Sequence, residues 1–205
     1  LGSISGSAQV LMSEPNMSPG QGQLLAIITR ESRRLSDALN QFLFQVRPAA
    51  LRPNPIDLGP VIGEAVTLLR NAPEVSAAHR VEFEADAGPH VCMADRDQML
   101  QVFWNLARNG LEAMPDGGLL RVRLWLWQGE LVLAVEDEGR GIASEDQLRI
   151  FEPFNSGSVR GTGLGLAIVY RIVQEHQGDI RVRSIRGRGT SVEVHLPLVA
   201  VPVPA

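Results

Sequence analysis

Residues 137–169 read DEGRGIASEDQLRIFEPFNSGSVRGTGLGLAIV and place glycine-rich turns on both sides of a Phe-Glu-Pro-Phe segment. Glycine loses more conformational freedom on folding than other residues, so a cluster of glycines indicates a backbone that must fit closely against something. Gly161, Gly163 and Gly165 lead into the apolar run LGLAIV, which is typical of a buried helix. The free N–H groups and the dipole of such a helix N-terminus predict an anion site.

A carboxylate lies just before these glycines. The strand predicted over residues 131–137 alternates, and Asp137 is the last member of its core-facing row. A carboxylate in that row needs a hydrogen-bond donor or a place at a pocket mouth, and an adenine amino group is one such donor. Gly139 and Gly141 would let the backbone approach a flat ring. The alternative is an ordinary turn at a strand end.

A third polar group lies on a helix predicted over residues 95–114, with an N-cap at its first residue. Asn105, Asn109 and Glu112 share one face of this helix by their spacing, and Arg108 is beside them. Amide oxygens can coordinate Mg²⁺, and arginine can pair with phosphate. The alternative, equally supported by this segment alone, is an exposed polar face.

The remaining pattern is a mixture of helices and strands. Helices are predicted over 58–70, 95–114 and 163–176, and strands over 79–86, 90–94, 119–127, 131–137, 179–185 and 190–196. The strand over 90–94 is expected to pair with the one over 79–86. This order differs from the regular alternation of a Rossmann domain and predicts an α+β fold, an α/β sandwich of a mixed sheet with one helical layer.

The first 47 residues have a different, helical pattern. Within 22–47 apolar positions step alternately by three and four, and this heptad seam comprises Leu25, Ile28, Ser32, Leu35, Leu39, Phe42 and Val46. With a helix expected over 1–12, it predicts a helical hairpin over 1–47 that buries its apolar face by self-association. The alternative is a plain core helix of a single domain.

Prolines divide the chain after this hairpin. RPAALRPNP, residues 47–55, contains three prolines and predicts a linker over 48–55. The mixed α and β domain follows over 56–198, and residues 199–205 are expected to be a tail.

Composition limits the function classes. The net charge of −4 gives no basic field that would attract nucleic acid or anionic lipid, so neither is expected as a partner. Cys92 is the only cysteine and cannot form an internal disulfide, which favours a reducing compartment and a cytoplasmic location. The sequence shows no membrane-spanning apolar run and no signal peptide, so a membrane contact would come only through parts upstream of Leu1.

The motifs gain specificity from their order. N-x-x-x-N on a helix is followed by D-x-G-x-G after a strand, F-E-P-F, G-T-G-L-G-L opening a helix, and GRGT (187–190) before the last strand. This order resembles the ATP-binding domain of bacterial sensor histidine kinases of two-component systems, with the gyrase, heat-shock chaperone and mismatch-repair ATPases as wider relatives. The resemblance covers about 56–198. QVFWNLARNGLEAMPDGG (101–118) is similar to the nitrogen-regulation and pilus-regulation kinases.

The resemblance implies ATP or ADP and Mg²⁺ as ligands. Asn109 would hold Mg²⁺, and Asp137 would bind the adenine amino group. The nucleotide-binding residues that it implies are Asn105, Arg108, Asn109, Asp137, Gly139, Gly141, Ile142, Arg160, Gly161, Thr162, Gly163, Leu164, Gly165, Leu166 and Thr190. Residues 143–162 would form a lid with Phe151 and Phe154 as its hydrophobic anchor. Ser158 stands where these relatives carry lysine, so either Arg160 supplies the charge or lid closure is weaker.

The resemblance also implies a reaction. The whole protein would transfer the γ-phosphoryl group of ATP to a histidine and then to an aspartate of a response-regulator receiver domain, as a homodimer joined through the hairpin. Residues 1–47 resemble the second part of the dimerisation and histidine-phosphotransfer hairpin and contain no histidine. The phosphoacceptor is therefore expected upstream of Leu1, and this chain is expected not to phosphorylate itself. The alternatives are a serine kinase or ATPase of the same superfamily and a nucleotide-sensing scaffold.

Overall fold

The computed structural model describes residues 11, 18, 20–29, 51–147, 149–154 and 163–198. The chain divides into two units, Leu1–Ala49 and Ala50–Ala205. In the first unit, residues 20–29 are helical, which confirms the described part of the helix expected over 22–47; the rest of that helix and its seam lie outside the described residues. Leu24, Ile27 and Ile28 are exposed by 61%, 45% and 44%, so this helix presents an apolar surface.

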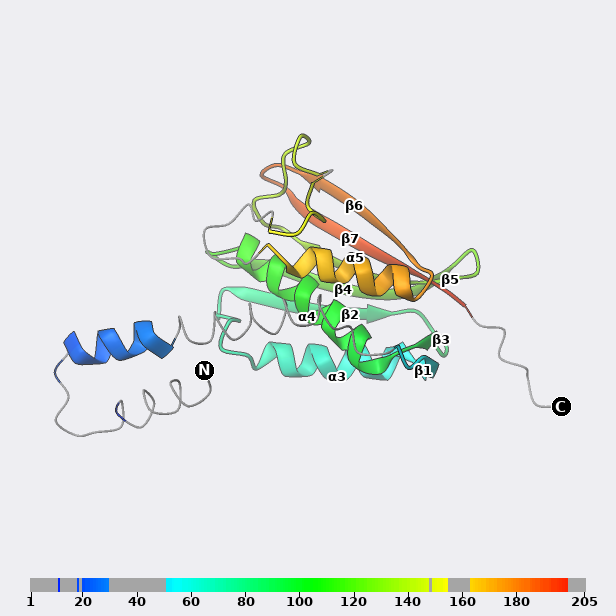
Figure 1. Ribbon diagram of the computed structural model, residues 1–205, viewed down its shortest axis with the longest axis horizontal. Helices are drawn as coiled ribbons and strands as arrows, with labels where there is room; N and C mark the ends of the chain where they lie inside the picture. The colour runs from blue at the N-terminus through cyan, green and yellow to red at the C-terminus, as the bar shows by residue number, and fades with distance from the viewer. Residues whose placement is uncertain are drawn as a thin grey trace. The chain divides into compact units, whose positions relative to one another are not determined.

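The second unit packs three helices on a mixed five-stranded sheet, as the sequence predicted (Figure 1). The helices are α3 (Leu58–Arg70), α4 (Arg96–Ala113) and α5 (Gly165–Glu175). The strands are β1 (Asn54–Asp57), β2 (His79–Ala85), β3 (Val91–Ala94), β4 (Gly118–Trp127), β5 (Glu130–Asp137), β6 (Asp179–Ile185) and β7 (Gly189–Pro197). The main sheet has the order β2-β4-β5-β7-β6, and β1 and β3 form a separate pair.

The pairing of β3 differs from the prediction that it pairs with β2. β3 runs antiparallel to β1, and β2 runs parallel to β4. The reason lies in two hydrogen bonds at the start of α3. The His90 N–H donates to Asp57 Oδ1 at 3.0 Å, and the Leu58 N–H donates to the His90 carbonyl at 3.0 Å. These bonds fasten β3 to the segment that leads into α3. β1 has no counterpart among the elements that the sequence predicted.

The core lies between the sheet and the helices, with β5 at its centre. Four consecutive β5 residues, Leu131 to Ala134, are fully buried, so both faces of this strand are covered. α4 packs between α3 and α5 and contacts β5. α3 and α4 begin at side-chain caps: Asp57 accepts from the Gly59 N–H, and Asp95 accepts from the N–H groups of the second and third α4 residues. The predicted N-cap at Asp95 is therefore confirmed.

The turn between β4 and β5 has a conformation that suits a hairpin. Gln128 and Gly129 both have positive φ, 50° and 83°, as the two central residues of a type I′ turn require. That turn matches the right-handed twist of the flanking strands, and β4 then pairs with the whole of β5, from Leu120 opposite Asp137 to Trp127 opposite Glu130.

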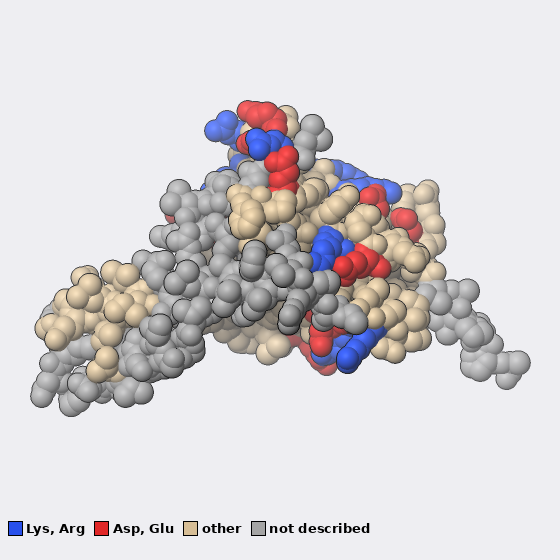
Figure 2. Space-filling view, viewed as in Figure 1, with Lys and Arg blue, Asp and Glu red and all other residues tan. Residues whose placement is uncertain are grey.

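Charges on this unit are paired locally. On the face in Figure 2, basic and acidic side chains lie next to one another instead of forming patches of one sign. Arg149 and Glu152 are 3.0 Å apart, and Arg171 and Glu175 are 2.9 Å apart. Within the described residues, no helix is both long and apolar enough to cross a membrane.

Candidate functional site

The N-terminus of α5 lacks the side-chain cap that α3 and α4 have. Leu164 occupies the N-cap position, no side chain from the described residues caps the helix, and its first turn contains no acidic residue. The N–H groups of the first turn of a helix have no partner within the helix. Together with the helix dipole, they form a place for an anion, as the glycine pattern predicted. Leu164 is buried and Leu166 half-buried, so Leu164 could contribute only through its backbone.

The amide face of α4 lies against this helix end. A Cβ atom on Gly165 would be 3.2 Å from Asn105 Oδ1 and 3.9 Å from Asn109 Nδ2. The Asn105 Nδ2 atom donates to the Gln101 carbonyl at 2.9 Å, which leaves Oδ1 on the side of Gly165. The structure therefore brings together two groups of residues that lie far apart in the sequence. Amide oxygens beside the backbone N–H groups of a helix N-terminus suit a metal-bound phosphate.

The exposure of the neighbouring residues makes this face accessible. Asn109 and Arg108 are exposed, whereas Asn105 is half-buried. In the described parts of the chain, no three His, Cys, Asp or Glu side chains are grouped as a metal site would be. The side-chain donors on this face that could hold a divalent cation are the amide oxygens of Asn105 and Asn109.

Asp137 lies at the end of β5, next to α4. A Cβ atom on Gly110 would be 3.4 Å from the Asp137 Cβ, so this carboxylate is beside the residue that follows Asn109. Its Oδ1 accepts the Gly139 N–H at 2.9 Å, and the backbone N–H of Thr190 also donates to it. Burial raises the pKa of Asp137, and the two N–H donors and Arg140 partly offset that rise. The carboxyl group is held at a fixed position with lone pairs to spare.

Gly139 and Gly141 are required by packing inside the protein. A Cβ atom on Gly139 would be 2.6 Å from the carbonyl oxygen of Ala113, at the end of α4. Gly141 has φ +63°, and a Cβ atom there would be 2.1 Å from the Ile185 carbonyl oxygen. In the structure these glycines let the loop pass between α4 and the β6–β7 turn, and the role in the approach of a flat ring that the sequence assigned to them stays a prediction.

Thr190 and Ile142 meet at Ser184, a residue that the sequence analysis missed. Ser184 Oγ lies 2.9 Å from Thr190 Oγ1 and accepts the Ile142 N–H at 2.8 Å. Gln147 Nε2 donates to the carbonyl oxygens of Ile142 and Ser184, at 3.2 and 3.0 Å. One signal for Ser184 exists in the sequence: it ends the inward row of β6, as Asp137 ends that of β5.

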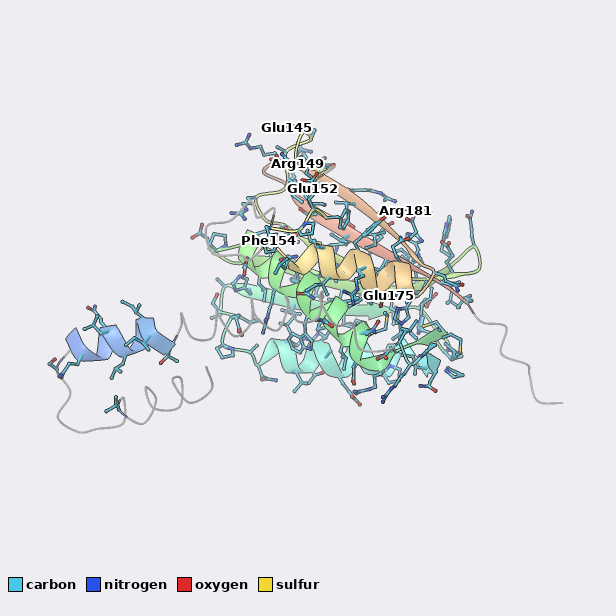
Figure 3. The ribbon with its side chains drawn as sticks, in the orientation of Figure 1. Glu145, Arg149, Glu152, Phe154, Glu175 and Arg181 are labelled. Atoms are coloured by element: carbon cyan, nitrogen blue, oxygen red, sulfur yellow. The ribbon has the colours of Figure 1, made fainter. Side chains whose placement is uncertain are left out.

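The two phenylalanines expected to anchor a lid behave differently. The Phe151 ring lies against Tyr170 of α5, with ring centroids 5.5 Å apart. Phe154 is 67% exposed, so its role as a hydrophobic anchor is wrong. Its N–H donates to the Gly163 carbonyl at 3.0 Å, which places it near the start of α5 (Figure 3). The proposed site residues Arg160, Gly161 and Thr162, and the departure at Ser158, lie outside the described residues.

All four histidines of the chain are described, and each is engaged inside the protein. His90, His176 and His195 are 3%, 6% and 3% exposed. The His90 ring bonds to Asp86, and the His195 ring bonds to Glu130. The His176 ring accepts the Asp95 N–H and bonds to the Ile172 carbonyl. The ring of half-buried His79 bonds to Ser76 on one side and to the Met114 carbonyl on the other. None of these imidazoles presents a free nitrogen at the surface.

Known proteins share both the sequence and the fold. Sporulation kinase C of Bacillus subtilis (strain 168) is 34% identical over 201 residues, which are 97% of this chain and 46% of that protein. Histidine kinase ThkA, solved in complex with response regulator protein TrrA, is 26% identical with a TM-score of 0.74, over 96% of this chain and 57% of that one. Full-length ShkA in complex with AMPPNP has a TM-score of 0.77 at 22% identity, over 98% of this chain and 44% of that one, and shows the fold alone.

The chain thus spans less than half the length of sporulation kinase C. A match to a sporulation kinase does not single out the nitrogen-regulation and pilus-regulation kinases, so that narrower assignment stays a prediction. Residues 94–200 match the family model described as "Histidine kinase-, DNA gyrase B-, and HSP90-like ATPase". Because this match extends over more than half of the residues, the chain belongs to the histidine kinase-, DNA gyrase B- and HSP90-like ATPase family.

Proposed function

We propose that this chain is the ATP-binding catalytic core of a protein-histidine kinase of a two-component system. The observation that carries the proposal is the placement of Asn105 and Asn109 against the glycine-led N-terminus of α5, with Asp137 held beside them. The similarity to a sporulation kinase and to histidine kinase ThkA supports it. A cytoplasmic location belongs to the same proposal, because ATP is the substrate.

The residues divide by the part of the nucleotide that they would bind. The N–H groups at the start of α5 would bind phosphate oxygens, with Arg108 near them and, from outside the described residues, Arg160, Gly161 and Thr162. Asn109 would coordinate Mg²⁺ through its amide oxygen. When bound, Mg²⁺ supplies positive charge that neutralises the phosphates. Asp137 would accept the adenine amino group, and Thr190, Gly141 and Ile142 would line that end.

Replacing the proposed metal ligand tests this arrangement. We expect Asn109→Ala to abolish the dependence of nucleotide affinity on Mg²⁺, because the amide oxygen that holds the ion is removed. Calorimetric titration of ADP with and without Mg²⁺ measures this. Asn71→Ala, the same deletion at the end of α3, is the control and should keep the dependence. An unchanged Mg²⁺ effect in Asn109→Ala would make this helix face merely polar surface.

The phosphoryl acceptor follows from the histidines. Because all four imidazoles are engaged, we infer that none of them accepts the phosphoryl group. Positioning supplies most of the rate of phosphoryl transfer, so an imidazole held away from the site is no substitute. Incubation of this chain with γ-labelled ATP should therefore leave it without acid-labile label.

A longer form of the protein that carries the acceptor histidine should be labelled. Nucleotide binding by that form without any label would favour the alternative of a nucleotide-sensing scaffold. Acid-labile label on His79, His90, His176 or His195 would refute the inference about the acceptor.

The partners of the proposed kinase are a receiver domain and a second copy of the chain. The complex of ThkA with TrrA supports a response regulator as partner. Ile28, the seam residue that is 44% exposed in helix 20–29, supports self-association through the heptad seam.

A charge in the seam should therefore break the dimer. We expect Ile28→Asp to convert any dimer into monomer, because an unpaired carboxylate in an apolar interface is strongly unfavourable. Gln23→Asp adds the same charge to the same helix at an exposed position off the seam, and should leave the dimer intact. Light scattering during size-exclusion chromatography measures the mass. Equal masses for both variants would place Ile28 outside the interface.

A further inference from the structure

Ser184 lies in one cross-strand row with two of the proposed adenine-site residues. Asp137 is directly opposite Thr190 in the β5–β7 pair, and Thr190 is directly opposite Ser184 in the β6–β7 pair. Residues directly opposite one another across neighbouring strands point to the same face of a sheet. Asp137 belongs to the row that faces the helices, so all three side chains share that face at one end of the sheet.

The hydroxyl of Ser184 makes three contacts whose donors can be assigned. The Ile142 N–H is only a donor, and it reaches Ser184 Oγ at 2.8 Å. The Gly189 carbonyl is only an acceptor, and it lies 3.0 Å from Ser184 Oγ, which therefore gives it its single proton. The third contact, 2.9 Å to Thr190 Oγ1, is then a hydrogen bond only if Thr190 is the donor.

This assignment fixes the chemical character of Thr190. Its only hydroxyl proton points at Ser184, so Thr190 Oγ1 can present nothing but lone pairs to any other neighbour. Asp137, when ionised, is also an acceptor only. The row therefore offers two neighbouring hydrogen-bond acceptors and no side-chain donor where the proposed nucleotide base lies.

We propose that Ser184 is a positioning residue that makes this site select a 6-amino purine against a 6-oxo purine. The inference rests on the proposed nucleotide site. A 6-amino group donates hydrogen bonds and matches the two acceptors, whereas a 6-oxo group is itself an acceptor and cannot pair with either of them. A site built to hydrogen-bond one group rejects an analogue that lacks it far more strongly than an apolar site can.

The same hydroxyl holds the loop that follows Asp137. The Ile142 N–H donates to Ser184 Oγ, which ties Ile142 directly to β6. Gln147 adds a second link, because its Nε2 donates to the carbonyl oxygens of both Ile142 and Ser184. Without the Ser184 hydroxyl, the Thr190 proton loses its acceptor and is free to rotate toward the base. Thr190 would then donate to a 6-oxo group, and discrimination would fall.

The test compares two nucleotides that differ at the 6-position of the base. The dissociation constants of ADP and inosine diphosphate are measured by calorimetry with Mg²⁺. We expect wild type to prefer ADP, and Ser184→Ala to reduce the ratio of the two constants by about tenfold, the loss of one hydrogen-bond preference. Ser184→Thr keeps the hydroxyl and should keep the ratio. Ser191→Ala, on the opposite face beside Glu136, is the matched control and should also keep it.

The possible results of this experiment distinguish a failure of the inference from a failure of the proposed function. A Ser184→Ala protein with a lowered melting temperature and an unchanged ratio would show a purely structural role and overturn the inference. Wild type that binds neither nucleotide would instead refute the proposed function. If Ser184→Ala does not fold, Thr190→Val decides, because it removes the oriented hydroxyl itself: a ratio reduced about tenfold supports the inference, and an unchanged ratio overturns it.

Discussion

Asp137→Asn is expected to weaken ADP binding by about tenfold to a hundredfold. The proposed hydrogen bond joins a neutral amino group to a carboxylate, and bonds to charged groups are worth roughly 1.5–3 kcal/mol. Each 1.4 kcal/mol corresponds to about a factor of ten in affinity. The substitution preserves size, and the amide keeps its oxygen on the Gly139 N–H, so that a donor replaces the acceptor that would face the amino group. Calorimetric titration with ADP measures the loss.

Asp179→Asn is the matched control for this change. Asp179 begins β6 at the opposite end of the sheet, where it lies across from His195, and its side chain is exposed. The same substitution there should leave ADP affinity unchanged. Equal affinities of wild type and Asp137→Asn would remove Asp137 from the proposed site.

The pH dependence of binding gives a second signature of Asp137. Burial raises its pKa above the ordinary value of 3.8, so protonation begins at a higher pH than for an exposed aspartate. Because the ionised form accepts the amino group, ADP affinity should fall as the pH is lowered through this raised pKa, and Asp137→Asn should lack that fall. The stability of the nucleotide-free protein should depend on pH in the opposite direction. The raised pKa of Asp137 contributes to the free energy of unfolding at low pH, and this contribution is lost as the pH rises through that pKa.

Gly189→Ala is expected to destabilise the domain by about 3 kcal/mol or more. Gly189 has φ +109°, a conformation that residues with a side chain rarely adopt, and a Cβ atom there would be 1.9 Å from the Asp137 carbonyl oxygen. That oxygen belongs to the central strand and cannot move aside as a flexible side chain could. Urea denaturation measures the free energy of unfolding.

Gly187→Ala, in the same turn, distinguishes the destabilisation caused by backbone strain from that caused by the steric clash of a new Cβ atom. Gly187 also has a positive φ, +76°, but a Cβ atom there would meet nothing within 4 Å. Only the backbone strain remains, which is worth about 1–2 kcal/mol. If the two alanine variants were equally stable, the close approach of the β6–β7 turn to Asp137 would not limit the fold.

Sequence reasoning succeeded where a pattern was long and local. The helix of α4, its cap at Asp95, and the strands β4 and β5 follow from periodicity within one segment. It failed for β3, whose partner β1 precedes it by a helix and a strand and is chosen by hydrogen bonds of Asp57 and His90. No periodicity within β3 carries that information.

The site divides in the same way. Asn109, Asp137 and Gly165 were found as separate local motifs, but no spacing within a helix places α4 against the start of α5; that association came from the family resemblance. Ser184 lies 42 residues from Ile142, and only the sheet brings the two together. Phe154 was misjudged because its aromatic character predicts burial, whereas its side chain is exposed at the positive-φ position where it meets Gly163.

The β4–β5 hairpin also bears on the order in which the domain folds. Its turn needs only Gln128 and Gly129, so its ends meet with little loss of chain entropy. The parallel pair β2–β4, by contrast, must wait until β3 and the whole of α4 have crossed over. The hairpin is thus suited to form in the folding transition state, and the β2 edge is suited to join the sheet afterwards.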